Sequence, residues 1–183
     1  MPSAGRVIVG VSGSPASLRA LRLAEHLARS RGADLLPVLA WLPPGGDRAD
    51  RSQPSAELRR IWREGACRRL QAALATAWGE EPSDLVVLPQ VERGNAGRVL
   101  TILASQPDDV LVVGAGRRSP FGRIWCTVCR YCIAHARCPV VLVPPPELAR
   151  DARRLRLAWT FRRRALTAEE VLRHGDPGHS VSS

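Results

Sequence analysis

The residues best placed to do chemistry follow the apolar run Val110–Val113. Gly114 and Gly116 come first, then Arg117 and Arg118, and Cys126 and Thr127 stand where the next helix should begin. A glycine-rich loop between a strand and a helix exposes backbone N–H groups, and the helix dipole favours an anion there. The spacing therefore predicts a phosphate site, with the hydroxyl of Thr127 and the loop arginines as further donors.

The same segment carries a run of cysteines that allows a second interpretation. Cys126, Cys129 and Cys132 follow one another at intervals of three, and Cys138 precedes Pro139. Such a run is similar to iron–sulfur and zinc motifs. However, residues three apart on a helix differ by about −60° in direction, so the first three thiols would spread across one face of the helix. Small buried hydrophobes, a metal site and a redox-sensitive Cys126 at a helix N-terminus all remain open.

Composition narrows the classes of function. The 183 residues carry a net charge of +10, and all 27 basic residues are arginine. Without lysine the chain cannot be a P-loop NTPase, a protein kinase or a Schiff-base enzyme. The positive charge suggests anionic ligands, but the arginines are scattered along the chain, so we do not expect nucleic acid as a partner. No apolar run approaches a membrane span, and we expect no signal peptide and a cytoplasmic location.

Strands and helices should alternate along the chain. The predicted strands are Arg6–Val11, Asp34–Ala40, Asp84–Val91, Asp109–Gly114 and Pro139–Val143. The predicted helices are 15–31, between an N-cap at Ser14 and a stop at Gly32, then Ser55–Trp78, Asn95–Ala104 and Ile124–Ala136, with Leu42–Pro54 as a loop. In the long helix the expected buried face consists of Leu58, Ile61, Trp62, Leu70, Ala73, Leu74 and Ala77.

Apolar strands that alternate with helices predict an α/β fold, a doubly wound five-stranded parallel sheet covered on both faces. Ligands bind such sheets at the carboxyl ends of the strands, near the switch point. The loops Gly10–Ser14 and Gly114–Arg123 should both lie at that edge. Residues 1–146 would form this domain, 147–174 a basic helical extension and 175–183 a disordered tail. We expect the extension to pack on its own domain or on a dimer mate.

The sequence resembles the universal stress protein family over about residues 5–145. The resemblance rests on Val112-Val-Gly-Ala-Gly-Arg-Arg118, on Val128 through Cys138-Pro-Val140, and on the opening segment Val7–Leu21. It implies the adenine nucleotide alpha hydrolase-like architecture and a homodimer paired through Pro139–Val143. It also implies ATP as ligand, with or without Mg²⁺, bound at positions that match Gly10, Ser12, Ala40, Gly114, Gly116, Cys126, Thr127 and Val128.

Three departures from the family pattern bear on the ligand. Ser12 replaces the family's aspartate, Cys126 replaces its last glycine, and Gly114 and Gly116 stand one residue closer together than usual. The resemblance favours a dimeric, ATP-binding stress sensor or regulator with little or no hydrolysis. A dimeric scaffold whose nucleotide site has decayed is the main alternative, and a cysteine-based redox or metal sensor is the third.

Overall fold

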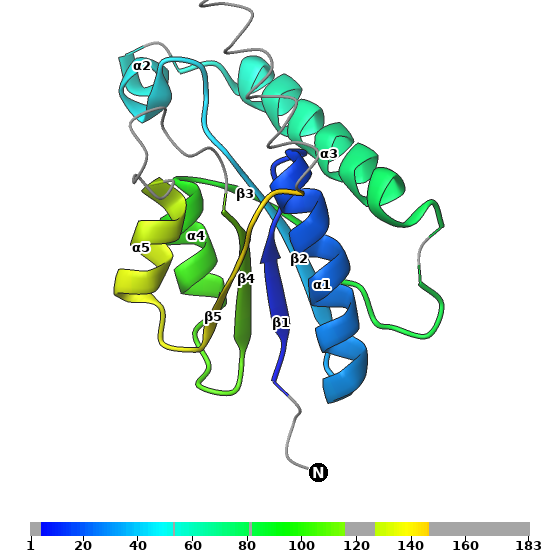
Figure 1. The fold of residues 1–183 in the computed structure, drawn as a ribbon. Helices are drawn as coiled ribbons and strands as arrows, with labels where there is room; N and C mark the ends of the chain where they lie inside the picture. Colours follow the sequence, from blue (N-terminus) through cyan, green and yellow to red (C-terminus); the bar gives the residue numbers. More distant parts are fainter. Residues whose placement is uncertain (1–4, 53, 81, 116–126, 147–183) are drawn as a thin grey trace, which may run out of the picture. The chain divides into compact units, whose positions relative to one another are not determined.

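A computed structural model describes residues 5–52, 54–80, 82–115 and 127–146, and shows a parallel sheet between two layers of helices (Figure 1). The strand order is β3-β2-β1-β4-β5, and every neighbouring pair is parallel. The strands are β1 (Val7–Gly10), β2 (Leu35–Trp41), β3 (Gln90–Arg93), β4 (Val110–Gly114) and β5 (Val140–Val143). The predicted doubly wound α/β fold is confirmed.

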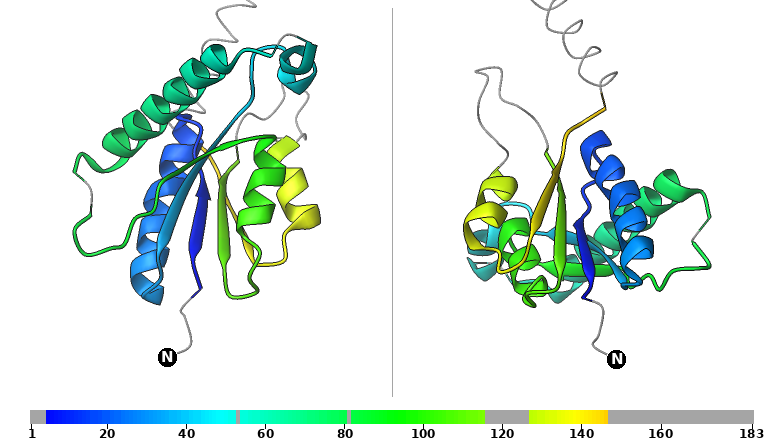
Figure 2. Two further views of the ribbon diagram at one scale, coloured as in Figure 1. Left: turned by 180° about the vertical axis from the view of Figure 1, so that it is seen from behind. Right: turned by 60° about the horizontal axis from the view of Figure 1, so that its bottom comes forward.

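Each face of the sheet is covered by two helices. On one face lie α1 (Pro15–Arg31) and α3 (Ala56–Trp78), and on the other lie α4 (Ala96–Leu103) and α5 (Thr127–His135) (Figures 1 and 2). Two hydrophobic clusters result, because successive side chains of each strand point to opposite faces. Val9 and Val112 contribute to the α1 side, whereas Ile8 and Leu111 contribute to the α4 side.

The first helix begins and ends where the sequence predicts. Ser14 is the N-cap, and its Oγ accepts a hydrogen bond from the backbone N–H of Ser17. Pro15 occupies the first helical position, where a missing N–H costs nothing. Gly32 closes the helix in the left-handed region, with φ at 61°, which a residue with a Cβ adopts rarely.

The long helix α3 packs a narrower face than predicted. Trp62, Ala66 and Leu70 contact the α1 side of the core, but Leu58 and Ile61 are each 45% exposed. Ile61 precedes Trp62 and is therefore turned about 100° away from it on the helix. Ile61 belongs to the solvent side of α3, whereas Leu58 is exposed in its first turn, so the predicted burial of both residues is wrong.

Two predictions between β2 and α4 are also corrected. The predicted loop Leu42–Pro54 contains a helix, α2 (Gly46–Ser52). The third strand is Gln90–Arg93 and not Asp84–Val91, although Val87 makes an isolated bridge to Leu35. Pro89 lies between this bridge and β3. Because it has no N–H to donate, the ladder of hydrogen bonds is interrupted there.

The domain limits stay a prediction, because 147–174 and 175–183 lie outside the described residues. Within the described part of the chain, no helix is long and apolar enough to cross a membrane.

Candidate functional site

The candidate site lies where the loops that follow β1 and β4 leave the sheet. These two strands are neighbours, and Gly10 pairs with Val113, the residue before Gly114. From β1 the chain proceeds to β2 on one side, and β4 begins the other half of the sheet. The place where their carboxyl ends meet is therefore the switch point, at which doubly wound sheets bind ligands, and we refer to it as the strand-end crevice.

The loop after β1 is built from hydroxyl groups that contact one another. Ser12 Oγ lies 3.0 Å from Ser14 Oγ, and the backbone N–H of Ser12 donates to Ser17 Oγ at 3.3 Å. Ser17 Oγ in turn donates to the carbonyl of Ser14 at 2.9 Å. Gly13 between them has φ at 73°. Ser12 itself is exposed, so this predicted site residue faces solvent at the sheet edge.

The N-terminus of α1 and the first described turn of α5 both lie near this edge. In α1 the Ser14 cap occupies one backbone N–H, and Pro15 has none to offer. Helix α5 begins at Thr127, whose side chain is exposed. Cys129, in the first turn, donates from Sγ to the carbonyl of Gly114 at 3.6 Å, which holds α5 against the end of β4. Thr127 and the half-buried Val128 are thus brought close to Gly114.

The two predicted glycines of this edge have a packing role that sequence reasoning missed. A Cβ on Gly114 would lie 2.7 Å from the backbone of Ala16 and Ser17 in α1. A Cβ on Gly10 would lie 2.9 Å from Cδ1 of Leu100 in α4. Each glycine therefore lets a helix approach the sheet closely. Alternation of apolar residues could not reveal this requirement, because it depends on contacts distant in sequence.

Ala40 lies one strand away from the switch point, on the α4 face of the sheet. Val38 pairs with Gly10, and Ala40 stands two residues further toward the carboxyl edge, opposite Glu92 of β3. The position is half-buried and close enough to the strand ends to contact part of a ligand held at the crevice.

An ion-pair network beside this edge was not predicted. Asp50 of α2 is 7% exposed and accepts a hydrogen bond from Arg93 Nη2 at 2.8 Å, while Arg59 Nε lies 3.6 Å away. Through these two arginines, Asp50 connects α2 to α3 and to the end of β3. No sequence signal could have found it, since the segment around Asp50 reads as a loop and Arg93 follows the predicted strand.

Several predicted site residues fall outside the described part of the chain. These are Gly116, Arg117, Arg118 and Cys126, and their roles stay predictions.

The described cysteines of the predicted cysteine run belong to the core or its border. Cys129 and Cys132 are fully buried on the α4 side of the sheet, and Cys138 is half-buried. Burial raises the pKa of the Cys138 thiol, and the charge of Asp109 adds to this effect. Among the described residues, no three His, Cys, Asp or Glu side chains are grouped to hold a metal ion.

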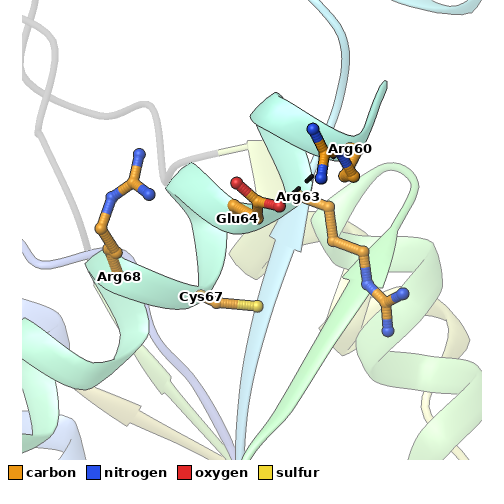
Figure 3. Close-up of a pocket in the computed structure, with 5 residues that line it drawn as sticks. All are labelled: Arg60, Arg63, Glu64, Cys67 and Arg68. Carbon is orange, nitrogen blue, oxygen red and sulfur yellow. Dashed lines mark ion pairs between the residues drawn. The ribbon is translucent and has the colours of Figure 1, made fainter. Parts of the chain in front are cut away.

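A separate basic hollow of about 440 Å³ lies on α3 (Figure 3). It is lined by Arg60, Arg63, Glu64, Cys67 and Arg68. Glu64 lies 3.9 Å from Arg60, a weak pair between two exposed side chains. All five residues come from one helix, so no second element contributes a side chain to the hollow.

The model of the universal stress protein family matches residues 4–144. The chain belongs to this family. The matched region contains all five strands and the segments that follow β1 and β4.

Solved universal stress proteins have the same fold. The protein from Archaeoglobus fulgidus is 25% identical, with a TM-score of 0.56, over 76% of this chain and 98% of that one. UspA from Lactobacillus plantarum is 20% identical, with a TM-score of 0.56, over 78% and 99%. A universal stress protein in complex with cAMP is 23% identical, with a TM-score of 0.50, over 79% and 99%. A search among curated proteins gave no significant match.

Proposed function

We propose that this universal stress protein binds an adenine nucleotide, ATP in the first instance, and acts as a stress-linked sensor or regulator with little or no hydrolysis. The observation that carries the proposal is the convergence of the β1 loop, the end of β4 and the N-terminus of α5 at the switch point of the sheet. A family member of the same fold has been solved with cAMP, which supports an adenine ligand.

The phosphate would be bound at the start of α5. The first backbone N–H groups of this helix and the exposed hydroxyl of Thr127 are donors beside the end of β4. The sequence adds Arg117 and Arg118 in the loop that enters α5, where planar guanidinium groups suit bidentate contacts with phosphate. Ala40 would contact the adenine from β2. None of these residues is a general base, which agrees with binding in preference to turnover.

The test is calorimetric titration of the purified protein with ATP. We expect saturable binding that Thr127→Val weakens by about tenfold, which is the loss of one hydrogen bond to a charged phosphate. Thr76→Val is the matched control, because Thr76 is an exposed helical threonine of α3 whose Oγ1 only donates to the carbonyl of Ala72. Equal affinity of both variants would contradict a phosphate site at the start of α5.

The main alternative is a scaffold whose nucleotide site has decayed through Ser12 and Cys126. The double variant Arg117→Ala/Arg118→Ala separates the two functions, because only a nucleotide site should lose affinity. Arg63→Ala/Arg68→Ala removes the same charge from the basic hollow on α3 and is its control. Absence of ATP binding by the unmodified protein, with no nucleotide retained from the host, would favour the scaffold.

We further propose a cytoplasmic homodimer paired through Pro139–Val143. β5 is an edge strand of the sheet, and Val140, Val141 and Leu142 along it are only half-buried. An apolar strand edge tends to acquire a partner. Sedimentation equilibrium should give about twice the monomer mass, and a monomer at all concentrations would overturn this part of the proposal.

A further inference from the structure

The basic hollow on α3 combines a thiol with three guanidinium groups. Its lining residues stand at positions i, i+3, i+4, i+7 and i+8 of the helix, so they share one face over about two turns: Arg60, Arg63, Glu64, Cys67 and Arg68. The volume of the hollow, about 440 Å³, lies within the range of roughly 300–1,000 Å³ that small-molecule sites occupy. The hollow therefore has room for a small molecule.

The charge of this hollow is positive. Among the described residues that line it, Glu64 is the only acidic one, and its carboxylate lies 3.9 Å from Arg60 Nε. Within the described part of the chain, neither Arg63 nor Arg68 has an ion-pair partner. A ligand that carries carboxylates can therefore pair with these two guanidinium groups without displacing an existing partner.

The thiol of Cys67 belongs to the same face of α3 as Arg63. Residues four apart are neighbours on a helix surface, and Figure 3 shows both side chains extending to the same side of α3. Cys67 is half-buried, whereas Cys129 and Cys132 are fully buried. Of these three thiols, Cys67 is therefore the one that a reagent in solvent can reach.

From the hollow, its charge and its thiol we infer that α3 binds a small acidic disulfide and that Cys67 forms a mixed disulfide with it. The arginines select the charge of the ligand, because they attract its carboxylates before any bond forms. The thiol supplies the covalent step. The inference concerns residues of α3 alone and does not depend on nucleotide binding at the strand-end crevice.

The covalent step is a thiol–disulfide exchange. Cys67 loses its proton to water, and its thiolate attacks one sulfur of the bound disulfide. A new S–S bond to Cys67 Sγ forms as the original S–S bond breaks, and the other half leaves as a thiolate that takes up a proton. The sulfur of Cys67 is oxidised and the departing half of the ligand is reduced, so no further oxidant is required.

The experiment compares two reagents on the reduced full chain. Glutathione disulfide carries carboxylates, whereas iodoacetamide is uncharged, and mass spectrometry of the tryptic peptide that contains Cys67 measures the rate of each modification. Arg63→Gln removes one charge from the hollow. Arg69→Gln is the matched control, because Arg69 is exposed on the same helix but does not line the hollow.

At low salt we expect Arg63→Gln to slow the reaction with glutathione disulfide about threefold, which corresponds to the loss of one unit charge about 6 Å away in water. Arg69→Gln should react with this disulfide at nearly the rate of the unmodified protein. Both variants should keep the rate with iodoacetamide. Salt at about 1 M should remove the effect of Arg63→Gln, since it shortens the Debye length to about 3 Å.

Three results would overturn the inference. The first is an equal rate of the two variants with glutathione disulfide. The second is alkylation of Cys67 by iodoacetamide while glutathione disulfide leaves it unmodified, which would show that the hollow does not admit an acidic disulfide. The third is an equal slowing of both reagents by Arg63→Gln, because the arginine would then act on the thiol and not on the ligand.

Discussion

Half-buried Arg6 and buried Asp109 form a clamp between the starts of β1 and β4. Asp109 is 1% exposed, and its carboxylate accepts hydrogen bonds from Arg6 Nη2 at 2.9 Å and from Arg6 Nε at 3.2 Å. It also accepts from the backbone N–H groups of Arg6 and Gln106. The clamp joins, at the amino end, the same two strands whose carboxyl ends form the candidate site.

Asp109→Asn should therefore destabilise the protein by about 2 kcal/mol, because the buried side chain loses its charge-assisted hydrogen bonds from Arg6. Urea unfolding followed by circular dichroism measures the change. Asp108→Asn is the matched control, since its side chain is exposed and its neighbourhood in sequence is the same. Equal midpoints for the two variants would show that the clamp contributes nothing.

The same carboxylate predicts how stability depends on pH. Burial by itself raises the pKa of Asp109, but the hydrogen bonds from Arg6 and Gln106 and the charge of Arg6 outweigh it and leave the pKa below its usual value. A carboxylate whose pKa is lower in the folded state stabilises the fold above its unfolded pKa. This contribution should disappear as the pH falls through the folded pKa. Unfolding free energies measured from neutral pH downward should fall less steeply in Asp109→Asn.

The two glycines of the site edge should respond differently to the same substitution. In Gly114→Ala the new Cβ meets α1 backbone atoms, which cannot move without shifting the helix, and we expect a loss of about 3 kcal/mol. In Gly10→Ala it meets the end of the Leu100 side chain, which can rotate, and we expect about 1 kcal/mol. Thermal unfolding of both variants tests the order, and a larger loss for Gly10→Ala would contradict it.

The fold could be predicted from sequence because its strands are short apolar runs between clear helix signals. Ser14, Pro15 and Gly32 mark α1 by local chemistry alone, and so their prediction is confirmed. The errors arise where the local sequence carries no helix or strand pattern. Helix α2 is polar and has no apolar face, and it is held in place by the ion pairs of Asp50 with Arg59 and Arg93, which are distant in sequence. Leu58 and Ile61 are apolar but exposed, because Leu58 lies in the first turn of α3 and Ile61 points away from the face that contains Trp62.

The candidate site shows the same division. That the β1 and β4 loops meet follows from strand order, which alternation and handedness predict. The contacts of the two glycines are different. Gly10 faces α4 and Gly114 faces α1, because the two residues lie on opposite faces of the sheet. Sequence could not assign those faces, because both faces of a central parallel strand are apolar.

The described cysteines should differ in their reactivity toward iodoacetamide in the folded protein. Cys67 is partly exposed on α3 and should react first. Cys138 should be slower, because burial raises the pKa of its thiol and lowers the fraction of thiolate. Cys129 and Cys132 are fully buried and should react only after unfolding.

Tryptic peptides resolve these thiols by mass spectrometry, since arginines separate Cys67, Cys132 and Cys138, and fragment ions distinguish Cys129 from Cys126 within peptide 124–130. Protein labelled in denaturant is the control and should react at every position. Protection of Cys129 and Cys132 in the folded protein would support the packing of α5 beneath the proposed phosphate site. Labelling of Cys132 as fast as Cys67 would mean that α5 detaches from the sheet, and its N-terminus could not then hold a phosphate.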